Sequence, residues 1–423
     1  MAGPLDGIRV VDFTEIIAGP LAGRLLADLG AEVIKVEPPW GEPWRFTQAF
    51  KPTESRNFMV YNSGKRSLPL DLTKDAAKEI IARLVAQADV ALVNYRPDVA
   101  VKLGVDYEAL SLLKPTLVYC ELTAFGRQGP DAHRPGYDMI IQAMTGMIAS
   151  ETKNVDGVPS WIWSSPLVDT SAGLCIAESV CAALFARERT GRGQKIETSL
   201  LASALTLIGG RFLHVESLDK EMREKTLKDL QDKRATGASY DELVESSPGS
   251  RRKQYHGDIY YRVYMTADGP IGVGCLSDTL RRRLLETLVL TDNALEPGWD
   301  PNLPESLVHG RDLKQRAESL FREKSSEEWL ELLESKGIPA GPVRFIEELF
   351  SDPQVLANGL VTEVTHSQEG PVKMVGPMAH FGGTPLPATR PSPALGEHSA
   401  EVLRGLGFTR SDIEGFKDAG VVG

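Results

Sequence analysis

Short apolar runs and amphipathic segments alternate along the first 125 residues of the chain. The runs typical of buried strands are 8–13, 33–36, 90–95 and 117–122. The segments with helical spacing of apolar residues are 19–30, 75–87 and 107–114. The first of these ends at Gly30, where a glycine suits a helix C-cap. Strands that alternate with helices in this way predict parallel βαβ units, and hence an α/β domain with a doubly wound sheet.

A second block runs from Pro135 to about Gly210, and its longest predicted helix covers 173–189. The apolar residues expected on one face of this helix are Leu174, Ala177, Val180, Cys181, Leu184 and Phe185. Residues 215–253 are rich in charge and poor in large apolar groups, which predicts a solvated helix and loop.

Beyond this polar stretch, 260–274 predicts a hairpin that turns at Asp268-Gly269. Helical segments follow to about Lys336, and from residue 352 the chain is rich in Pro and Gly, with helices expected near 399–406 and 410–419. We expect two α/β domains. Their bounds are a Rossmann-like large domain at 1–210, completed by about 395–423, a linker at 211–254, a small domain at 255–340 and a return linker at 341–394.

Composition excludes several classes of protein. The 47 Lys and Arg against 58 Asp and Glu give a net charge of −11, which argues against a nucleic-acid partner. A local positive pocket can still hold an anion. The chain shows no signal-peptide pattern at its N-terminus, no run of about 18 apolar residues and no paired cysteines. We therefore expect a cytoplasmic globular enzyme with reduced cysteines and no membrane partner.

Common catalytic motifs are absent. The loop after the first predicted strand, FTEIIAGPLAG, lacks the GxGxxG pattern of dinucleotide sites, although the helix that begins near Gly19 could direct backbone N–H groups at an anion. GxSxG, HExxH and P-loop patterns do not occur, and the seven histidines are scattered. We expect no metal site.

Asp169 is a candidate functional residue because it lies just before the long predicted helix, in the segment VDTSAG. An Asp at this place is a favoured N-cap, which accepts hydrogen bonds from the first helical N–H groups. The same place suits a nucleophile, since the helix dipole would keep the carboxylate ionised and nearby N–H groups could hold an oxyanion. Residue physics alone leaves both interpretations open.

Several motifs together resemble the class III CoA-transferases, the family that includes formyl-CoA:oxalate and carnitine CoA-transferases and α-methylacyl-CoA racemase. The resemblance covers nearly the whole chain except about residues 211–330. Its motifs are PLDGIRVVDFTEIIAGPLAGRLLADLGAEVIKVEPP, NSGKRSLPLDL, VNYRPDVAVKLGVDYEAL, PGYDMIIQAMTGM, VDTSAG, ARERTGRGQKIETSLLASAL, GIPAGPV, SDPQVLAN and LGEHSAEVL.

The resemblance implies that Asp169 is the nucleophile. In the family's terms, Asn94–Arg96 would contact the adenosine of CoA, Lys102 would stand for a phosphate-binding Arg, and 136–138 would lie beside the thioester. The implied CoA contacts are Ile17, Ala18, Leu70, Thr73, Asn94, Tyr95, Arg96, Lys102, Gly136, Tyr137 and Asp138. Ile17 and Pro38 depart from the formyl-CoA enzyme, so the acceptor acid stays open.

Tyr137 separates the two chemistries of the family. The racemase uses a histidine here, which titrates near 6.5, whereas a tyrosine titrates near 10 and is a poor proton carrier at neutral pH. We therefore expect CoA transfer from an acyl-CoA to a small carboxylic acid, through an aspartyl anhydride and an aspartyl-CoA thioester. An acyl-CoA racemase or a non-catalytic CoA-binding protein are the alternatives. Coenzyme A enters as part of the substrate, no cofactor is held tightly, and relatives imply an interlocked, ring-shaped homodimer.

Overall fold

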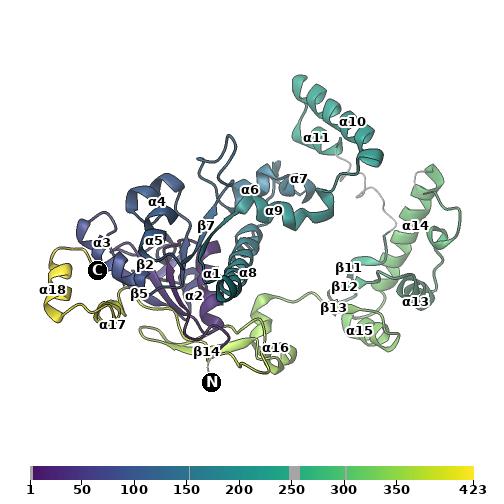
Figure 1. Ribbon diagram of the computed structural model, residues 1–423. Coiled ribbons are helices and arrows are strands. Elements are labelled where there is room, and N and C mark those ends of the chain that lie inside the picture. Colours follow the sequence, from purple (N-terminus) through teal and green to yellow (C-terminus); the bar gives the residue numbers. More distant parts are fainter. Residues whose placement is uncertain (1–2, 152, 247–257, 301–302) are drawn as a thin grey trace. The chain divides into compact units, whose positions relative to one another are not determined.

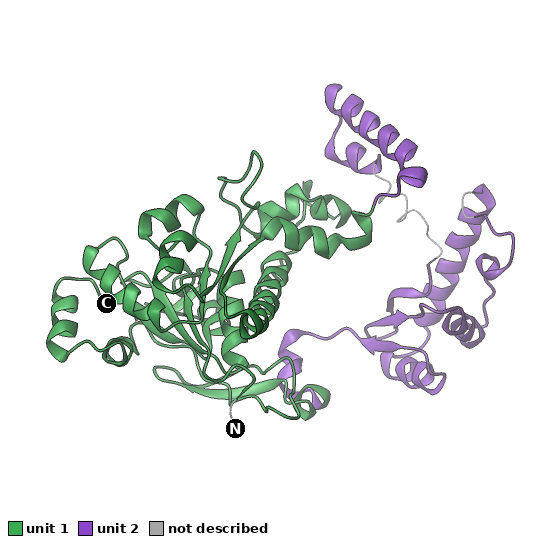
Figure 2. Cartoon of the chain, in the orientation of Figure 1, with its two compact units in different colours: residues 1–213, 354–423 green, residues 214–353 purple. Residues whose placement is uncertain are grey.

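The computed structural model describes residues 3–151, 153–246, 258–300 and 303–423. The chain divides into two compact units (Figure 2). Unit 1 comprises residues 1–213 and 354–423, and unit 2 comprises residues 214–353.

Unit 1 is built on a six-stranded sheet in which every neighbouring pair is parallel (Figure 1). In spatial order its strands are β10 (Gln194–Ser199), β7 (Val118–Thr123), β6 (Val90–Val93), β1 (Arg9–Asp12), β2 (Glu32–Glu37) and β5 (Arg66–Pro69). Numbered along the chain, these six strands run 3-2-1-4-5-6 across the sheet. The order reverses between β1 and β6, so their carboxyl ends flank the crevice in which open α/β sheets bind ligands.

Helices cover both faces of this sheet, because alternate strand residues point to opposite sides. One face packs against α3 (Asp75–Ala86), α4 (Pro97–Leu103), α5 (Tyr107–Leu113), α17 (Ser399–Gly405) and α18 (Arg410–Asp418). The other packs against α1 (Ala18–Asp28), α6 (Asp138–Met144), α8 (Leu167–Thr190) and α9 (Leu200–Ile208). The remaining elements of unit 1 are α2 (Arg56–Asn62), α7 (Met147–Glu151), α16 (Pro353–Ala357) and the strand pairs β3 (Ala49–Lys51) with β4 (Glu54–Ser55), β8 (Asn154–Val155) with β9 (Val158–Pro159), and β14 (Val361–His366) with β15 (Gly370–Val375).

The predicted strands and helices of the first 125 residues are confirmed to within a few residues. Gly30 has φ +105° directly after α1, which is the left-handed conformation expected of a residue that follows a helix C-cap. The strands β5 and β10 were not predicted. Strand β5 has only four residues, and the six-residue β10 (QKIETS) carries Lys and Glu on a partly exposed edge, so its apolar pattern is weak.

Helix α8 differs from its prediction. It begins at Leu167 rather than near Gly173, and Leu174 and Phe185, expected in the core, are 40% and 60% exposed. Its length and apolar composition would suit a membrane span. However, Val168, Ala172, Ile176 and the residues that follow them on this face are buried in the core of unit 1, as expected of a central helix.

Unit 2 holds its own small core, formed between a three-stranded antiparallel sheet and three helices. The predicted hairpin is confirmed as β11 (Tyr261–Met265) and β12 (Pro270–Gly274). The other elements are α10 (Glu216–Ala235), α11 (Tyr240–Glu245), α13 (Asp278–Leu288), α14 (Pro304–Phe321), α15 (Ser326–Ser335) and β13 (Ala340–Pro342). The run Ser250–Lys253 and most of the segment 247–261 lie outside the described residues.

Candidate active site

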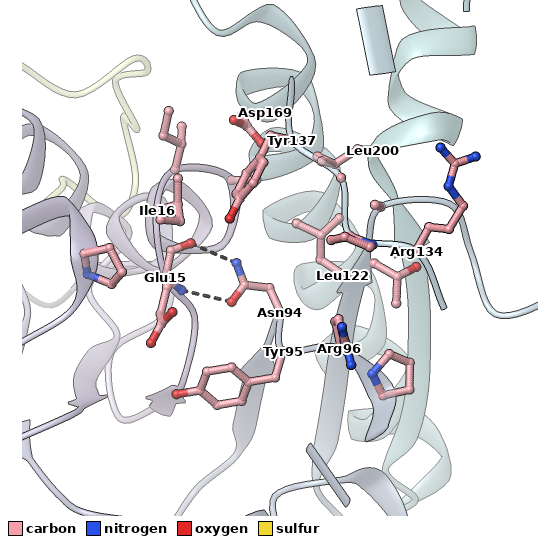
Figure 3. Close-up of a pocket in the computed structure, with 18 of the residues that line it drawn as sticks. Glu15, Ile16, Asn94, Tyr95, Arg96, Leu122, Arg134, Tyr137, Asp169 and Leu200 are labelled. Carbon is pink, nitrogen blue, oxygen red and sulfur yellow. Dashed lines mark hydrogen bonds between the residues drawn. The ribbon is translucent and has the colours of Figure 1, made fainter. Parts of the chain in front are cut away.

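A cavity of about 270 Å³ lies at the point where the strand order of the sheet reverses. Residues Glu15–Ala18, which follow β1, and Asn94–Pro97, which follow β6, form two of its walls. The side chain of Asn94 joins these walls: its Oδ1 accepts a hydrogen bond from the Glu15 backbone N–H at 2.9 Å, and its Nδ2 donates to the Glu15 carbonyl at 2.8 Å (Figure 3). We call this the main cavity.

Eight of the residues singled out in the sequence meet around the main cavity. They are Ile17, Ala18, Asn94, Tyr95, Arg96, Gly136, Tyr137 and Asp169. Figure 3 shows Asp169, Tyr137 and Ile16 toward one end, with Glu15 and Tyr95 toward the other. Segments more than 70 residues apart in sequence thus converge on a single space.

Asp169 is not the N-cap of α8. The cap position is Pro166, whose side chain makes no hydrogen bond, and Asp169 lies in the first turn with only 9% of its surface exposed. The capping role belongs to Asp138. Its Oδ2 accepts hydrogen bonds from the backbone N–H groups of Val168 (2.8 Å) and Asp169 (3.1 Å). Since Asp138 satisfies these donors, the Asp169 side chain is left available to the cavity.

The surroundings of Asp169 favour its protonated form. Burial, together with the negative charge of Asp138, raises the pKa of Asp169 from 3.8 to about 7. This direction is opposite to the expectation from the helix dipole, because burial and the like charge of Asp138 disfavour the ionised form. Asp138 also holds its place through Gln142, whose Nε2 donates to Asp138 Oδ1 at 2.5 Å.

Close packing of two helices brings Asp169 to the start of α1. A Cβ placed on Gly173, one turn after Asp169, would lie 2.8 Å from the carbonyl oxygen of Ala18. Only glycine allows this approach. Ile16, in the loop before α1 and at the cavity wall, has φ +75°, an uncommon conformation for a β-branched residue and of the kind that clusters at functional sites.

A buried ionic network holds this loop in place. Glu42 Oε2 accepts a hydrogen bond from the Ile16 N–H at 2.8 Å, and Glu42 Oε1 pairs with Lys35 Nζ at 2.9 Å. Lys35 also donates to the Thr14 carbonyl at 2.7 Å, and Asp12 at the end of β1 pairs with Lys65 at 2.7 Å. These charges are fully buried, and their mutual pairing fixes the backbone that forms the cavity wall.

A second, smaller cavity of about 180 Å³ adjoins the first, and we call it the side cavity. Glu15 and Tyr95 line both cavities. Leu70 and Thr73, the other implied CoA contacts, lie here rather than in the main cavity. Burial and the charge of Glu42 raise the pKa of Glu15 to about 7, and burial also raises that of Tyr95.

The basic residues that the family resemblance assigns to CoA binding, Arg96 and Lys102, do not line the same cavity. Arg96 lines the main cavity and forms a bidentate pair with Asp98, at 3.1 and 2.6 Å. Lys102 is exposed on the last turn of α4 and lines neither cavity, although its neighbour Leu103 lines the side cavity. Arg134, paired with Asp131 at 2.9 Å, supplies a further positive charge at the main cavity.

Sequence reasoning missed Arg134, Glu15 and Trp40 as cavity residues. Arg134 directly precedes the PGYD motif, which was an available signal. Glu15 and Trp40 carried none, because a charge in a strand-to-helix loop and an aromatic in a Pro-Gly turn are ordinary surface features. In the described residues, no group of three or more His, Cys, Asp or Glu is arranged to hold a metal ion.

The fold and the site define a mixed α/β protein with a ligand cleft at the switch point of a parallel sheet and a buried carboxylate facing that cleft. A family model described as CoA-transferase family III matches residues 5–399. The chain belongs to this family and is an enzyme that transfers CoA.

Two relatives and one solved structure are similar over nearly the whole chain. The chain is 33% identical over 412 residues to a succinate–glutarate CoA-transferase of Agrobacterium fabrum, covering 95% of this chain and 96% of that protein. It is 30% identical over 429 residues to a formyl-CoA:oxalate CoA-transferase of Streptomyces coelicolor, with 100% of both covered. A crystal structure of a CaiB/BaiF family protein from Brucella suis is 29% identical and aligns with a TM-score of 0.72 over 96% of this chain and 100% of that one.

Proposed function

We propose that this CoA-transferase moves CoA from an acyl-CoA donor to a small carboxylic acid, with Asp169 as the covalent nucleophile. The position of Asp169 carries the proposal. Its carboxyl group lines the main cavity, is nearly buried, and accepts no hydrogen bond from the described residues, because Asp138 takes the nearby N–H groups. A carboxylate that lines a cavity and makes no hydrogen bond to the described residues is suited to attack a bound thioester.

The reaction proceeds in four transfers that balance without an added proton. A carboxylate oxygen of Asp169 attacks the thioester carbonyl, the C–S bond breaks, and an aspartyl anhydride and CoA thiolate result. The thiolate attacks the aspartyl carbonyl, which releases the donor acid as a carboxylate and leaves an aspartyl-CoA thioester. The acceptor carboxylate then attacks this thioester to form a new anhydride, and the thiolate attacks the acceptor carbonyl to release the new acyl-CoA.

Two features of the site support this sequence. The start of α1, at Ile17 and Ala18, opens into the main cavity beside Asp169, where backbone N–H groups can stabilise the oxyanion of each tetrahedral step. Binding CoA through its distant nucleotide holds the thiolate in place while the anhydride exists. The loops after β1 and β6 are where a doubly wound sheet binds such a nucleotide.

Asp169→Ala and Asp169→Asn test the assignment, and both are expected to abolish transfer. Hydroxylamine or borohydride should modify Asp169 in the wild-type chain only when acyl-CoA is present. Near-full transfer by either variant would rule out this nucleophile. Exchange of the α-proton with solvent deuterium, without an acceptor acid, would instead point to a racemase, although Tyr137 at the cavity does not favour it.

We also propose that the enzyme is a homodimer, as its resemblance to ring-shaped relatives implies. Helix α10 is 20 residues long and contributes no residue to the core of unit 2, while Leu218 and Met222 on it are 76% and 45% exposed. A helix without a packed face is marginal in water. A second copy of the chain is the covering partner that supports this helix.

A further inference from the structure

The two cavities differ in charge. Arg96 and Arg134 line the main cavity, whereas the described residues that line the side cavity include no lysine or arginine. The ionisable side chains of the side cavity are Glu15, Glu37, Asp71 and the phenol of Tyr95. The main cavity therefore offers two guanidinium groups, each paired with an aspartate, as contacts for a phosphate, whereas the side cavity offers no cation and suits an uncharged group that carries hydrogen-bond donors.

Trp40 stands at the rim of the side cavity. Its side chain is 67% exposed, an unusual state for so large an apolar ring. The backbone beneath it is fixed by Pro38 and Pro39, and the turn is closed by a hydrogen bond from the Gly41 N–H to the Pro38 carbonyl at 2.8 Å. The indole thus projects from a rigid turn and is not packed into the hydrophobic core.

The remaining walls are largely apolar. Leu70 is 1% exposed and lines the cavity with Leu72, Leu103 and Tyr95. A volume of about 180 Å³ is below the usual range of roughly 300–1,000 Å³ for a whole ligand, so this space suits one ring system of a longer molecule. CoA offers one such group: its adenine is flat, uncharged and bears an amino group, while its phosphates are anionic.

We propose that Trp40 is the base-stacking residue of the CoA site, which covers the adenine ring in the side cavity while Arg96 and Arg134 of the main cavity face the phosphates. This inference rests on the proposed function, in that the substrate is a CoA thioester. It adds a specificity residue that the sequence motifs did not mark. A tryptophan face stacks on a base with a gain equivalent to roughly 5- to 150-fold in affinity.

Calorimetric binding of free CoA and of pantetheine, which lacks the nucleotide, to the full-length chain tests the proposal. Trp40→Ala is expected to weaken CoA binding by roughly 5- to 150-fold and to leave pantetheine binding unchanged. Trp40→Phe should retain most of the affinity, because it keeps an aromatic face. Trp163→Ala is the matched control, since Trp163 is 75% exposed and lines neither cavity.

The outcomes separate this inference from the proposed function. Equal CoA affinity of Trp40→Ala and the wild type would overturn base stacking and leave CoA transfer intact. Equal losses for CoA and pantetheine would also overturn it, because the effect would not depend on the base. A wild-type chain that binds no CoA would overturn the proposed function itself, and the role of Trp40 with it.

Discussion

Replacing Asp169 with asparagine removes a negative charge that is unfavourable in the surroundings of this side chain in the folded chain. The pKa of this carboxyl group rises from 3.8 to about 7 on folding, through burial and the charge of Asp138. At 1.36 kcal/mol per pH unit, this difference corresponds to about 4 kcal/mol. At pH 8 the wild-type chain folds with Asp169 ionised, so the neutral isostere should raise the free energy of unfolding by up to about 4 kcal/mol.

The sign of the effect depends on pH. Below about pH 4 the carboxyl group is protonated in both the folded and the unfolded chain, and the two variants should be equally stable. As the pH rises from 4 to 7, the unfolded chain releases this proton before the folded chain does, so wild-type stability falls. The gain from Asp169→Asn should therefore grow across this interval and level off above pH 7, while transfer activity is lost throughout.

Urea unfolding of the full-length chain at pH 5, 6.5 and 8, at one protein concentration, measures the difference. Tryptophan fluorescence reports on unit 1 through Trp40, Trp44, Trp161 and Trp163. Asp412→Asn is the matched control. Hydrogen bonds from Thr409 lower the pKa of Asp412, so the same substitution there should reduce stability at neutral pH. A gain from Asp169→Asn that is absent at pH 8, or as large at pH 5, would refute the reasoning.

Two further predictions concern the same site, and a third concerns the proposed dimer. Asp138→Asn keeps an oxygen that can accept hydrogen bonds from the N–H groups of α8 but removes the negative charge beside Asp169. The acidic limb of the pH profile of kcat/KM, expected near pH 7, should therefore move to lower pH. An unchanged acidic limb would contradict this prediction. Arg134→Ala should raise KM for acyl-CoA roughly tenfold, less so at high salt, whereas a salt-independent change would argue against a phosphate contact. Light scattering should give about twice the chain mass of 46.2 kDa, and a monomer would contradict the proposed dimer.

The individual strands and helices of the first 125 residues were predictable because each depends on the pattern of residues within its own segment. The apolar run of β1 and the glycine after α1 carry their own signals, and the structure confirms both. The order of the six strands depends on pairings between distant segments, for which periodicity holds no information. Strand β10 was missed for a related reason: its Lys and Glu suit an exposed edge but hide the strand pattern.

The candidate site, like the fold, was predictable only in part from the sequence. Asp169 was identified as one of two possibilities, a cap or a nucleophile, because both depend on its place beside a helix start. Excluding the cap required Asp138, which lies 31 residues earlier in the chain and takes the capping hydrogen bonds, and the nucleophile stays a proposal. Nothing in the segment PGYD indicates that the first residue of one helix caps another. The raised pKa of Asp169 follows from that contact and from burial, and neither is visible in sequence.

In the proposed mechanism, the burial that destabilises the folded chain also assists the attack by Asp169. An ordinary carboxylate of pKa about 4 that displaces a thiolate of pKa about 8.5 faces a difference of roughly 6 kcal/mol. A carboxylate of pKa about 7 reduces this difference to roughly 2 kcal/mol, because its greater proton affinity accompanies greater affinity for the acyl carbon. The loss of stability and the gain in nucleophilicity thus both follow from the raised pKa of Asp169. A variant that lowers the pKa of Asp169, such as Asp138→Asn, should for this reason stabilise the ionised site and slow the attack together.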